Sequence, residues 1–265
     1  MNARAVAVAE DPFVRALVPC TAVRGARLDG GVVCHTGSVR KRNEDAWFAD
    51  AEVGLFVVAD GMGGHAAGDV ASAMAVDVLA GLVEREGAVP VTEARAALRL
   101  AFSEASQRIF EAGGADVARR GMGTTLVALW VCGEVAVWAH VGDSRLYRLR
   151  DGAFTPLTLD HTPLGDMVRR GQIDRASAER HGPVRLLSRS VGTFPVVRTE
   201  VGEGEVHPGD RFLLCSDGLS DVVSRDALAR LLSDGPPSHA ARALTMAALE
   251  GGGPDNITAM VVDFE

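Results

Sequence analysis

The protein has 265 residues, of which 47% are hydrophobic and 23% are charged, and it carries a formal net charge of −8. This length and composition suit one large globular domain with a sizeable core. The acidic balance argues against a binding surface for nucleic acid or anionic membrane, which needs a basic face, and no apolar stretch approaches the ~20 residues that cross a bilayer.

The beginning of the chain shows weak periodicity. We expect residues 1–30 to form an N-terminal extension and residues 31–265 to form one globular domain. Two acidic residues and a proline at positions 10–12 interrupt the first segment, which is not typical of a secretory signal peptide.

The four cysteines are far apart in the sequence and form no CxxC pair. Two of them lie in apolar runs, where a free cysteine behaves as a small hydrophobic residue. We therefore expect structural thiols and a reducing compartment, which predicts a cytoplasmic protein. The cysteines are Cys20, Cys34, Cys132 and Cys215.

The first half of the domain is predicted to combine a buried strand with two helices. LFVVA, at Leu55–Ala59, is a short continuous apolar run, as expected of a strand that is buried on both faces. Apolar residues recur at helical spacing from residue 66 to about 86. A second helix is expected from about 92 to 112, with Thr92 as its N-cap.

The second half is predicted to contain more strands. Residues 124–131 and 134–141 have the pattern of a β-hairpin, and an alternating stretch then runs into a turn at Asp151-Gly152. Further strands are expected at 211–216 and 257–264, and further helices at 226–232 and 239–250. Clustered helices with strand meanders between them favour an α+β fold of stacked sheets flanked by helices over a βαβ repeat.

Two of these strands run directly into an Asp-Gly pair, at Asp60-Gly61 and at Asp217-Gly218. Carboxylates are rarely buried unless they are paired or bind a metal. A strand end holds such a group rigidly, and the glycine lets the backbone turn sharply and approach a ligand. Either pair alone is typical of an ordinary turn. Further acids stand at comparable places, namely Glu44, Asp45, Asp143 and Asp255.

Carboxylates delivered from several strand ends make an all-oxygen site. Such ligands suit Mg²⁺ or Mn²⁺ rather than Zn²⁺, which favours histidine and cysteine. Two such ions about 3.5–4 Å apart can share a carboxylate, deprotonate a bridging water and stabilise an in-line displacement. Taken together, the acids therefore favour a two-metal hydrolytic centre over a set of unrelated turns.

Seven segments in order resemble the metal-dependent protein phosphatases of the 2C type, in their bacterial form. The resemblance extends from about Gly37 to Glu265. It implies a four-layer α-β-β-α sandwich, in which two stacked, mainly antiparallel sheets are flanked by helices. The segments are VRKRNEDAW, FVVADGMGGHAAGDVAS, GMGTTLVAL, AHVGDSRLYRLRDG, LTLDHT, GDRFLLCSDGLSD and GGPDNITAMVV.

The resemblance implies metal-dependent hydrolysis of phosphoserine and phosphothreonine in proteins, opposing bacterial Ser/Thr kinases. It implies two Mn²⁺ or Mg²⁺ ions in the core site and a weaker third ion. Asp60 would bridge two metals, with the Gly61 carbonyl oxygen on one and Asp217 and Asp255 on the other. Asp143 would help to hold the third ion.

The resemblance also implies catalytic roles beside the metals. Glu44 and Asp45 would act mainly through metal-bound waters. Arg40 matches the arginine that grips the substrate phosphate, a role that suits the planar, permanently charged guanidinium. Lys41 and Arg42 are nearby alternatives whose simpler interpretation is solvated surface charge.

The general acid is left open by the sequence. Many eukaryotic members carry a histidine where this chain has Met62, and bacterial members commonly have methionine there. His65 or a metal-bound water could protonate the leaving alcohol instead. We expect His140 and His161 to be structural.

Residues 161–189, called the flap below, carry six arginines against three acidic residues. In the family this region lies beside the metal centre and contributes to substrate choice. A basic flap would help to recruit an acidic phosphoprotein. A solvated surface segment with short helices is an equally good interpretation.

Several other functions compete with a general phosphatase. One is a phosphatase dedicated to a single regulator, such as an anti-anti-sigma factor, and another is a catalytically silent phosphoprotein-binding module on the same fold. A two-metal nuclease is disfavoured, because it would need a basic groove. A dinucleotide-binding site is disfavoured, because Asp60 would lie against the pyrophosphate. A cysteine phosphatase is excluded, because Cys215 is not followed by a phosphate-cradling loop that ends in arginine. We expect phosphoprotein partners, no nucleic-acid or membrane partner, and a monomer.

Overall fold

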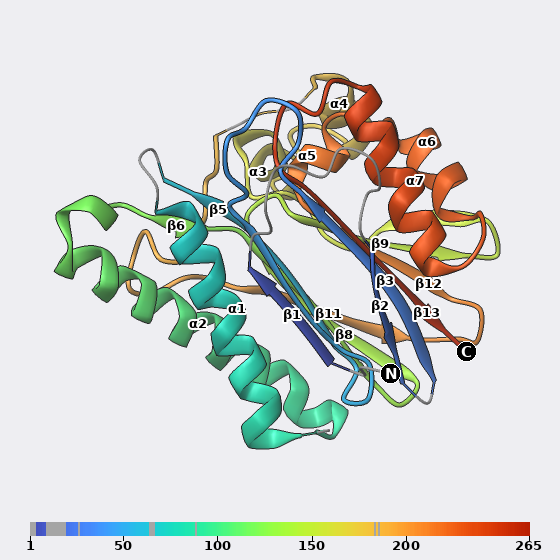
Figure 1. Ribbon diagram of the computed structural model, residues 1–265, viewed down its shortest axis with the longest axis horizontal. Coiled ribbons are helices and arrows are strands. Elements are labelled where there is room, and N and C mark those ends of the chain that lie inside the picture. Colours follow the sequence, from blue (N-terminus) through green and yellow to red (C-terminus); the bar gives the residue numbers. More distant parts are fainter. Residues whose placement is uncertain are drawn as a thin grey trace.

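Two antiparallel sheets lie face to face, with helices on both outer sides, in a computed structural model of the protein (Figure 1). This arrangement confirms the predicted four-layer α-β-β-α sandwich. Within the described part of the chain, no helix has the length and apolar character that a membrane crossing requires. The structure describes residues 4–8, 20–25, 27–63, 67–87, 89–182, 184 and 186–265.

The first sheet has the strand order β1-β4-β5-β7-β8-β11, and the short strand β6 pairs with β5. The hairpin of β7 and β8 is the one predicted from the sequence, and Gly133 with a φ of 65° lies in its turn. The strands are β1 (Arg4–Val8), β4 (Asp45–Asp50), β5 (Leu55–Met62), β6 (Gly123–Thr124), β7 (Leu126–Cys132), β8 (Val135–Val141) and β11 (Glu200–Glu205).

The second sheet has the strand order β10-β9-β12-β13-β3-β2. Its β9–β10 hairpin turns at Asp151 and Gly152, whose φ angles of 50° and 78° match the predicted Asp-Gly turn. The strands are β2 (Thr21–Arg24), β3 (Leu28–His35), β9 (Arg145–Arg150), β10 (Ala153–Pro156), β12 (Arg211–Cys215) and β13 (Ile257–Phe264).

The N-terminal segment contributes a strand to the edge of each sheet. Strand β1 pairs with β4, and β2 pairs with β3. Strand β3 begins at Leu28, so it crosses the predicted domain boundary at residue 30. That boundary stays a prediction.

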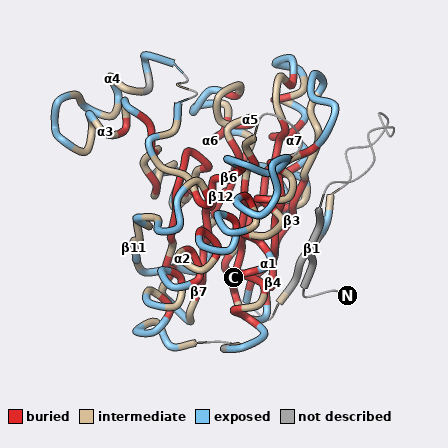
Figure 2. Tube along the Cα trace, turned by 90° about the vertical axis from the view of Figure 1, so that its left-hand side faces the viewer, coloured by how far each residue is buried: buried red, intermediate tan, exposed pale blue. Residues whose placement is uncertain are grey.

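Helices α1 (Gly68–Glu86) and α2 (Val91–Ala115) pack on the first sheet, and α7 (Pro237–Glu250) packs on the second together with α5 (Asp217–Ser220) and α6 (Arg225–Leu232) (Figure 1). A short 3₁₀ helix, η1 (Val117–Arg119), follows α2. The flap carries α3 (Pro163–Arg169) and α4 (Arg175–Arg180), and Figure 2 shows these two helices standing out from the buried strands.

The predicted N-cap of α2 was wrong. Pro90 is the N-cap, and its carbonyl oxygen accepts hydrogen bonds from the amides of Glu93 and Ala94. Thr92 therefore lies inside the first turn. Proline already has the extended backbone that a cap position needs, so a capping side chain is not required here.

Buried strands with two covered faces explain the continuous apolar runs. In β5, Phe56 and Val58 face the layer between the sheets, whereas Leu55 and Val57 face α1 and α2. In β12 the residues at even positions also face the layer between the sheets. Successive side chains of a strand point to opposite faces of the sheet. At the end of the apolar part of the inter-sheet layer, this alternation determines which polar residues enter the layer.

Candidate active site

The inter-sheet layer ends in a group of carboxylates. Asp45 and Asp60 lie directly opposite each other on β4 and β5. Asp60 is two residues beyond Val58, so it occupies the same face of β5 as the inter-sheet core. The apolar core and the carboxylate group therefore share one layer.

Asp45 is the most deeply buried of these acids, with 1% of its surface exposed. Its Oδ2 accepts hydrogen bonds from Ser216 Oγ at 2.8 Å and from Thr258 Oγ1 at 2.7 Å. Its Oδ1 is buried and has no hydrogen-bond partner among the residues that the structure describes. A buried carboxylate oxygen in that state is costly, and a cation or a cation-held water would satisfy it.

The carboxylates act on one another electrostatically. Burial raises the pKa of Asp60 well above its ordinary value, and the charges of Asp45, Asp217, Asp143 and Asp255 raise it further. Burial also raises the pKa of Asp45 to about 7 and that of Asp143 to about 8, with Asp217 adding to both. Mutual repulsion of this kind would be reversed by a divalent cation among the oxygens.

Gly61 does not turn the chain, contrary to expectation, because β5 continues through it to Met62. It does allow a close approach. A Cβ atom at Gly61 would lie 2.1 Å from the carbonyl oxygen of Gly68 and 2.6 Å from that of Glu44. The glycine is needed because three main-chain segments meet beside Asp60.

Asp217 is the first residue of α5 and is separated from the end of β12 only by Ser216, the N-cap of that helix. Gly218 lies within that helix, where a Cβ atom would be 1.9 Å from the carbonyl oxygen of Asn256. Asp255 lies just before β13, which begins at Ile257. Close packing at Gly218 therefore brings the Asp217 and Asp255 segments together.

Asn256 holds the loop that carries the proposed phosphate-binding residue. It is 4% exposed, and its Oδ1 accepts a hydrogen bond from the amide of Glu44 at 2.8 Å. Its Nδ2 donates to the carbonyl oxygens of Thr36 and Arg42, each at 2.8 Å. These three bonds fasten residues 36–44 to the start of β13, a role that the sequence analysis did not identify.

Glu44 lies beside the start of α1. A Cβ atom at Gly68, the first residue of α1, would lie 2.6 Å from Glu44 Oε2. Burial raises the pKa of Glu44, and the neighbouring charge of Asp69 adds to this effect. Glu44 thus belongs to the same region of concentrated negative charge.

Arg40 lies at the rim of the carboxylate group. Its side chain is 48% exposed, and its Nη2 donates to Asp255 Oδ2 at 2.7 Å. Lys41 and Arg42 are exposed. The structure therefore brings Arg40 to a candidate metal ligand and leaves about half of its side chain exposed.

Asp143 follows β8 and borders a cavity of about 470 Å³. The cavity lies between the flap and the α5–α6 segment, and its lining includes Leu164 and Val222. The candidate third-ion residue thus lies where the flap meets the sandwich.

Internal contacts hold several of the flap arginines. Arg169 and Arg189 lie 3.0 Å and 4.0 Å from Glu200, and Arg175 donates to the carbonyl oxygen of Thr158. These contacts weaken the interpretation of the flap as a basic recruiting surface. The candidate general acid His65 lies outside the described residues.

The cysteines are free thiols in the structure. Burial raises the pKa of Cys215 to about 12 and that of Cys132 to about 11. Thiols this far from ionisation are poor nucleophiles. The two residues act as core side chains, as expected.

The sequence analysis missed Ser216 and Thr258, which bind Asp45. A signal was present in the alternation of both strands. Counting forward in steps of two from Phe212 and Leu214 gives Ser216, and counting back from Val262 and Met260 gives Thr258, so both polar residues fall on the inter-sheet face. What alternation could not provide was the strand pairing that brings them to one carboxylate.

Residues 36–249 match the family model described as protein phosphatase 2C. The serine/threonine protein phosphatase PstP of Mycobacterium tuberculosis is 40% identical over 227 residues, which cover 86% of this chain and 43% of the relative. The protein phosphatase PhpP of Streptococcus pneumoniae is 34% identical over 211 residues, which cover 79% of this chain and 85% of that one. The chain thus spans less than half of the first relative and most of the second.

Solved structures show the same similarity. The crystal structure of M. tuberculosis PstP/Ppp has a TM-score of 0.83 and 38% identity, covering 90% of this chain and 99% of that one. A PstP catalytic domain in complex with two manganese ions has a TM-score of 0.80 and 38% identity, covering 89% and 98%. By both sequence and fold, this chain belongs to the protein phosphatase 2C family.

Proposed function

We propose that this protein is a metal-dependent phosphatase that hydrolyses phosphoserine and phosphothreonine in proteins. The observation that carries the proposal is the buried group of mutually repelling carboxylates, in which Asp45 Oδ1 finds no hydrogen-bond partner within the described part of the chain. This donor set fits divalent cations with hard oxygen ligands. The relatives PstP and PhpP, named as protein phosphatases, support it.

The residues divide into holding and orienting groups. Asp60, the Gly61 carbonyl oxygen, Asp217 and Asp255 would hold two ions, and Asp143 would contribute to a weaker third. We propose manganese or magnesium, and the two manganese ions in the PstP structure support the first. When bound, such ions supply an activated water and neutralise charge at phosphorus.

The chain's own groups would then position the substrate. Arg40 would bind phosphate oxygens with the exposed part of its guanidinium while keeping its contact with Asp255. Glu44 and Asp45 would orient water around the ions. Asn256 would hold the loop in register, because it binds the main chain on both sides of Arg40.

The substrates would be phosphorylated proteins, including a Ser/Thr kinase and its targets, whose phosphorylation this enzyme would oppose. The 470 Å³ cavity beside Asp143 would receive residues that flank the phosphorylated side chain. We further propose that the protein acts in cytoplasmic signal transduction as a monomer.

The test is hydrolysis of an aryl phosphate and of a phosphothreonine peptide with Mn²⁺, Mg²⁺ or EDTA. Wild type should turn over both substrates only with metal, and Asp217→Ala should lose activity. Asp77→Asn, an exposed acid in the middle of α1, is the matched control and should behave as wild type. A folded, metal-loaded wild type that hydrolyses neither substrate would contradict the proposal and favour a silent binding module.

A further inference from the structure

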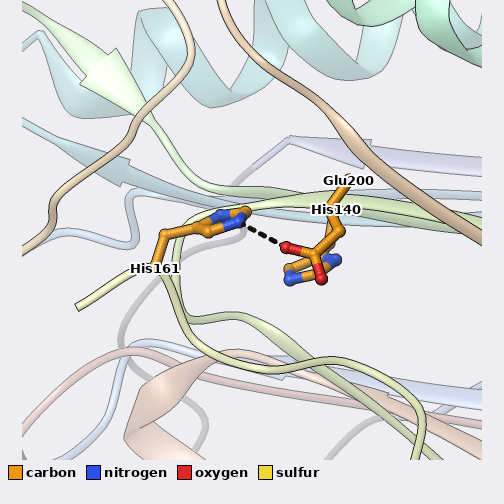
Figure 3. Close-up of side chains that lie close together, drawn as sticks. All are labelled: His140, His161 and Glu200. Atoms are coloured by element: carbon orange, nitrogen blue, oxygen red, sulfur yellow. Dashed lines mark hydrogen bonds and ion pairs between the residues drawn. The ribbon is translucent and has the colours of Figure 1, made fainter. Parts of the chain in front are cut away.

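A second cluster of titratable side chains, two buried histidines and a partly exposed glutamate, lies where the flap joins the sandwich. It consists of His140, His161 and Glu200 (Figure 3), and one ligand atom from each lies within 4.8 Å of the others. The two imidazole rings stack with centroids 4.6 Å apart and planes 4° from parallel. By proximity alone, this trio resembles a metal site.

The hydrogen bonds argue against a metal here. His161 Nδ1 accepts from the amide of Gly142 at 3.0 Å, so the ring hydrogen is on Nε2, which donates to Glu200 Oε2 at 3.1 Å. No lone pair of His161 is left for a cation. Arg169 and Arg189 already compensate the Glu200 charge. The pKa of Glu200 is lowered to about 2, and the hydrogen bond from His161 is the largest cause.

The main-chain contacts point to another role for His161. Its carbonyl oxygen accepts from the amide of Ser188 at 2.8 Å, so the two ends of the flap meet at this residue. Its amide donates to the carbonyl oxygen of Gly142 at 2.9 Å, while its ring accepts from the Gly142 amide. Both main-chain groups of Gly142 are therefore bound by one fully buried residue of the flap.

Gly142 transmits this contact to the candidate active site. It directly precedes Asp143 and has a φ of 102°, and a Cβ atom there would lie 2.7 Å from Thr125. Thr125 Oγ1 in turn accepts from the Asp60 amide at 3.0 Å. The main chain before Asp143 is thus held between His161 on the flap side and Thr125 on the Asp60 side.

We propose that His161 is a positioning residue that fixes Asp143 through the main chain of Gly142 and so couples the flap to metal affinity at Asp143. The inference rests on the proposed function, because it takes Asp143 as a ligand of the weakest ion. The two ring nitrogens separate the effects, since Nδ1 binds the Gly142 amide, whereas Nε2 faces Glu200 Oε2 and also lies 3.0 Å from Arg189 Nη1.

Two amide variants test this division. His161→Asn places an oxygen near the position of Nδ1 and keeps an acceptor for Gly142, whereas His161→Gln reaches Glu200 and leaves Gly142 without that acceptor. In calorimetric Mn²⁺ titrations, the Gln variant should bind the weakest ion about 10–100-fold less tightly, as found for residues that orient metal ligands. The Asn variant should stay within about threefold of wild type.

Controls connect the effect to Asp143. His207→Gln, at a half-exposed surface histidine, should leave all Mn²⁺ affinities unchanged. In an Asp143→Asn background, His161→Gln should cause no further loss of Mn²⁺ affinity, because residues that act through one another are not additive. Equal affinities in the Asn and Gln variants would overturn the proposal.

A second measurement decides the matter if the Gln variant does not fold. In wild type, saturation with Mn²⁺ should slow hydrogen exchange of the Gly142 and Ser188 amides, because coupling between two sites is reciprocal. Unchanged exchange at both amides would overturn the proposal. Failure of the proposed function would instead show as absent turnover by wild type, whatever the Mn²⁺ affinities of the variants.

Discussion

The carboxylate centre and the His161 cluster both lie where the inter-sheet layer meets the flap, and they differ in whether their negative charge is compensated. In the centre, carboxylates raise one another's pKa values, and Asp45 Oδ1 has no hydrogen-bond partner in the described ranges of the chain. In the cluster, Glu200 has a lowered pKa and lies beside two arginines. Proximity of ligand atoms therefore does not by itself indicate a cation site, whereas uncompensated negative charge does.

Of the variants that test this comparison, Asp60→Asn should have the largest effect on activity. It removes the acid that four other carboxylates repel, so activity with Mn²⁺ should fall by at least about 10³-fold, more than loss of a group that only orients a ligand. The metal-free protein should become more stable at pH 8, because each unit of raised pKa costs about 1.4 kcal/mol. Urea unfolding in EDTA measures the second effect.

Glu200→Gln is the matched change in the other cluster. It removes a stabilised charge, so metal-free stability should fall rather than rise, by less than about 1 kcal/mol because Glu200 is partly exposed. If both variants shifted stability in the same direction, the distinction between the two regions would fail.

The pH dependence of metal-free stability should show the same opposition. The pKa values of Asp45 and Asp143 are raised from 3.8 to about 7 and about 8 in the folded protein. From about pH 4 to these raised values, the folded protein therefore binds more protons than the unfolded chain. Their contribution is present below pH 4 and is lost as the pH rises to about 8. The free energy of unfolding in EDTA should therefore fall over that range.

Glu200 has the opposite sign. Its pKa is lowered from 4.5 to about 2, so its contribution is present above pH 4.5 and is lost as the pH falls toward 2. Saturating Mn²⁺ should abolish the alkaline loss caused by the aspartates and leave the acid loss caused by Glu200. A flat profile between pH 4 and 8 in EDTA would contradict the assigned pKa shifts.

Asn256→Ala should show how far the centre depends on its loop. The variant removes three hydrogen bonds of a buried amide and leaves main-chain partners unsatisfied, which should cost about 2–4 kcal/mol. Chemical unfolding measures this loss, with the exposed Asp77→Asn as the control. A loss below about 1 kcal/mol would show that water replaces these bonds.

Arg40 should affect activity less than Asp60 does, because its side chain is half exposed and acts at the rim. Arg40→Ala should lower kcat/KM for the phosphothreonine peptide by about 10–100-fold, through loss of charge-assisted phosphate contacts. Stability should change by less than about 1 kcal/mol, as for exposed ion pairs. Arg42→Ala, at an exposed neighbour, is the matched control, and an equal loss in it would show that Arg40 has no special role.

Local patterns predicted most of the framework. The apolar runs of β5, β12 and β13 fill both strand faces, and the helix spacing of α1 and α7 is sustained over several turns, so short-range periodicity was sufficient. The N-cap of α2 was predicted wrongly, because Pro90 supplies an extended backbone before the helix. Gly61 was predicted at a turn, but its role is to allow the main chain at Gly68 and Glu44 to approach closely. Only the packed structure shows this contact.

By itself, the sequence determined the buried strands, the acids that follow them and the order of the family motifs. Each of these is a property of neighbouring residues, and alternation or helical spacing expresses it directly. Only the tertiary structure decided that Ser216 and Thr258 bind one oxygen of Asp45, that Arg40 reaches Asp255, and that both ends of the flap meet at His161. Those contacts join segments far apart in the chain, and strand pairing and burial create both the contacts and the pKa shifts that follow from them.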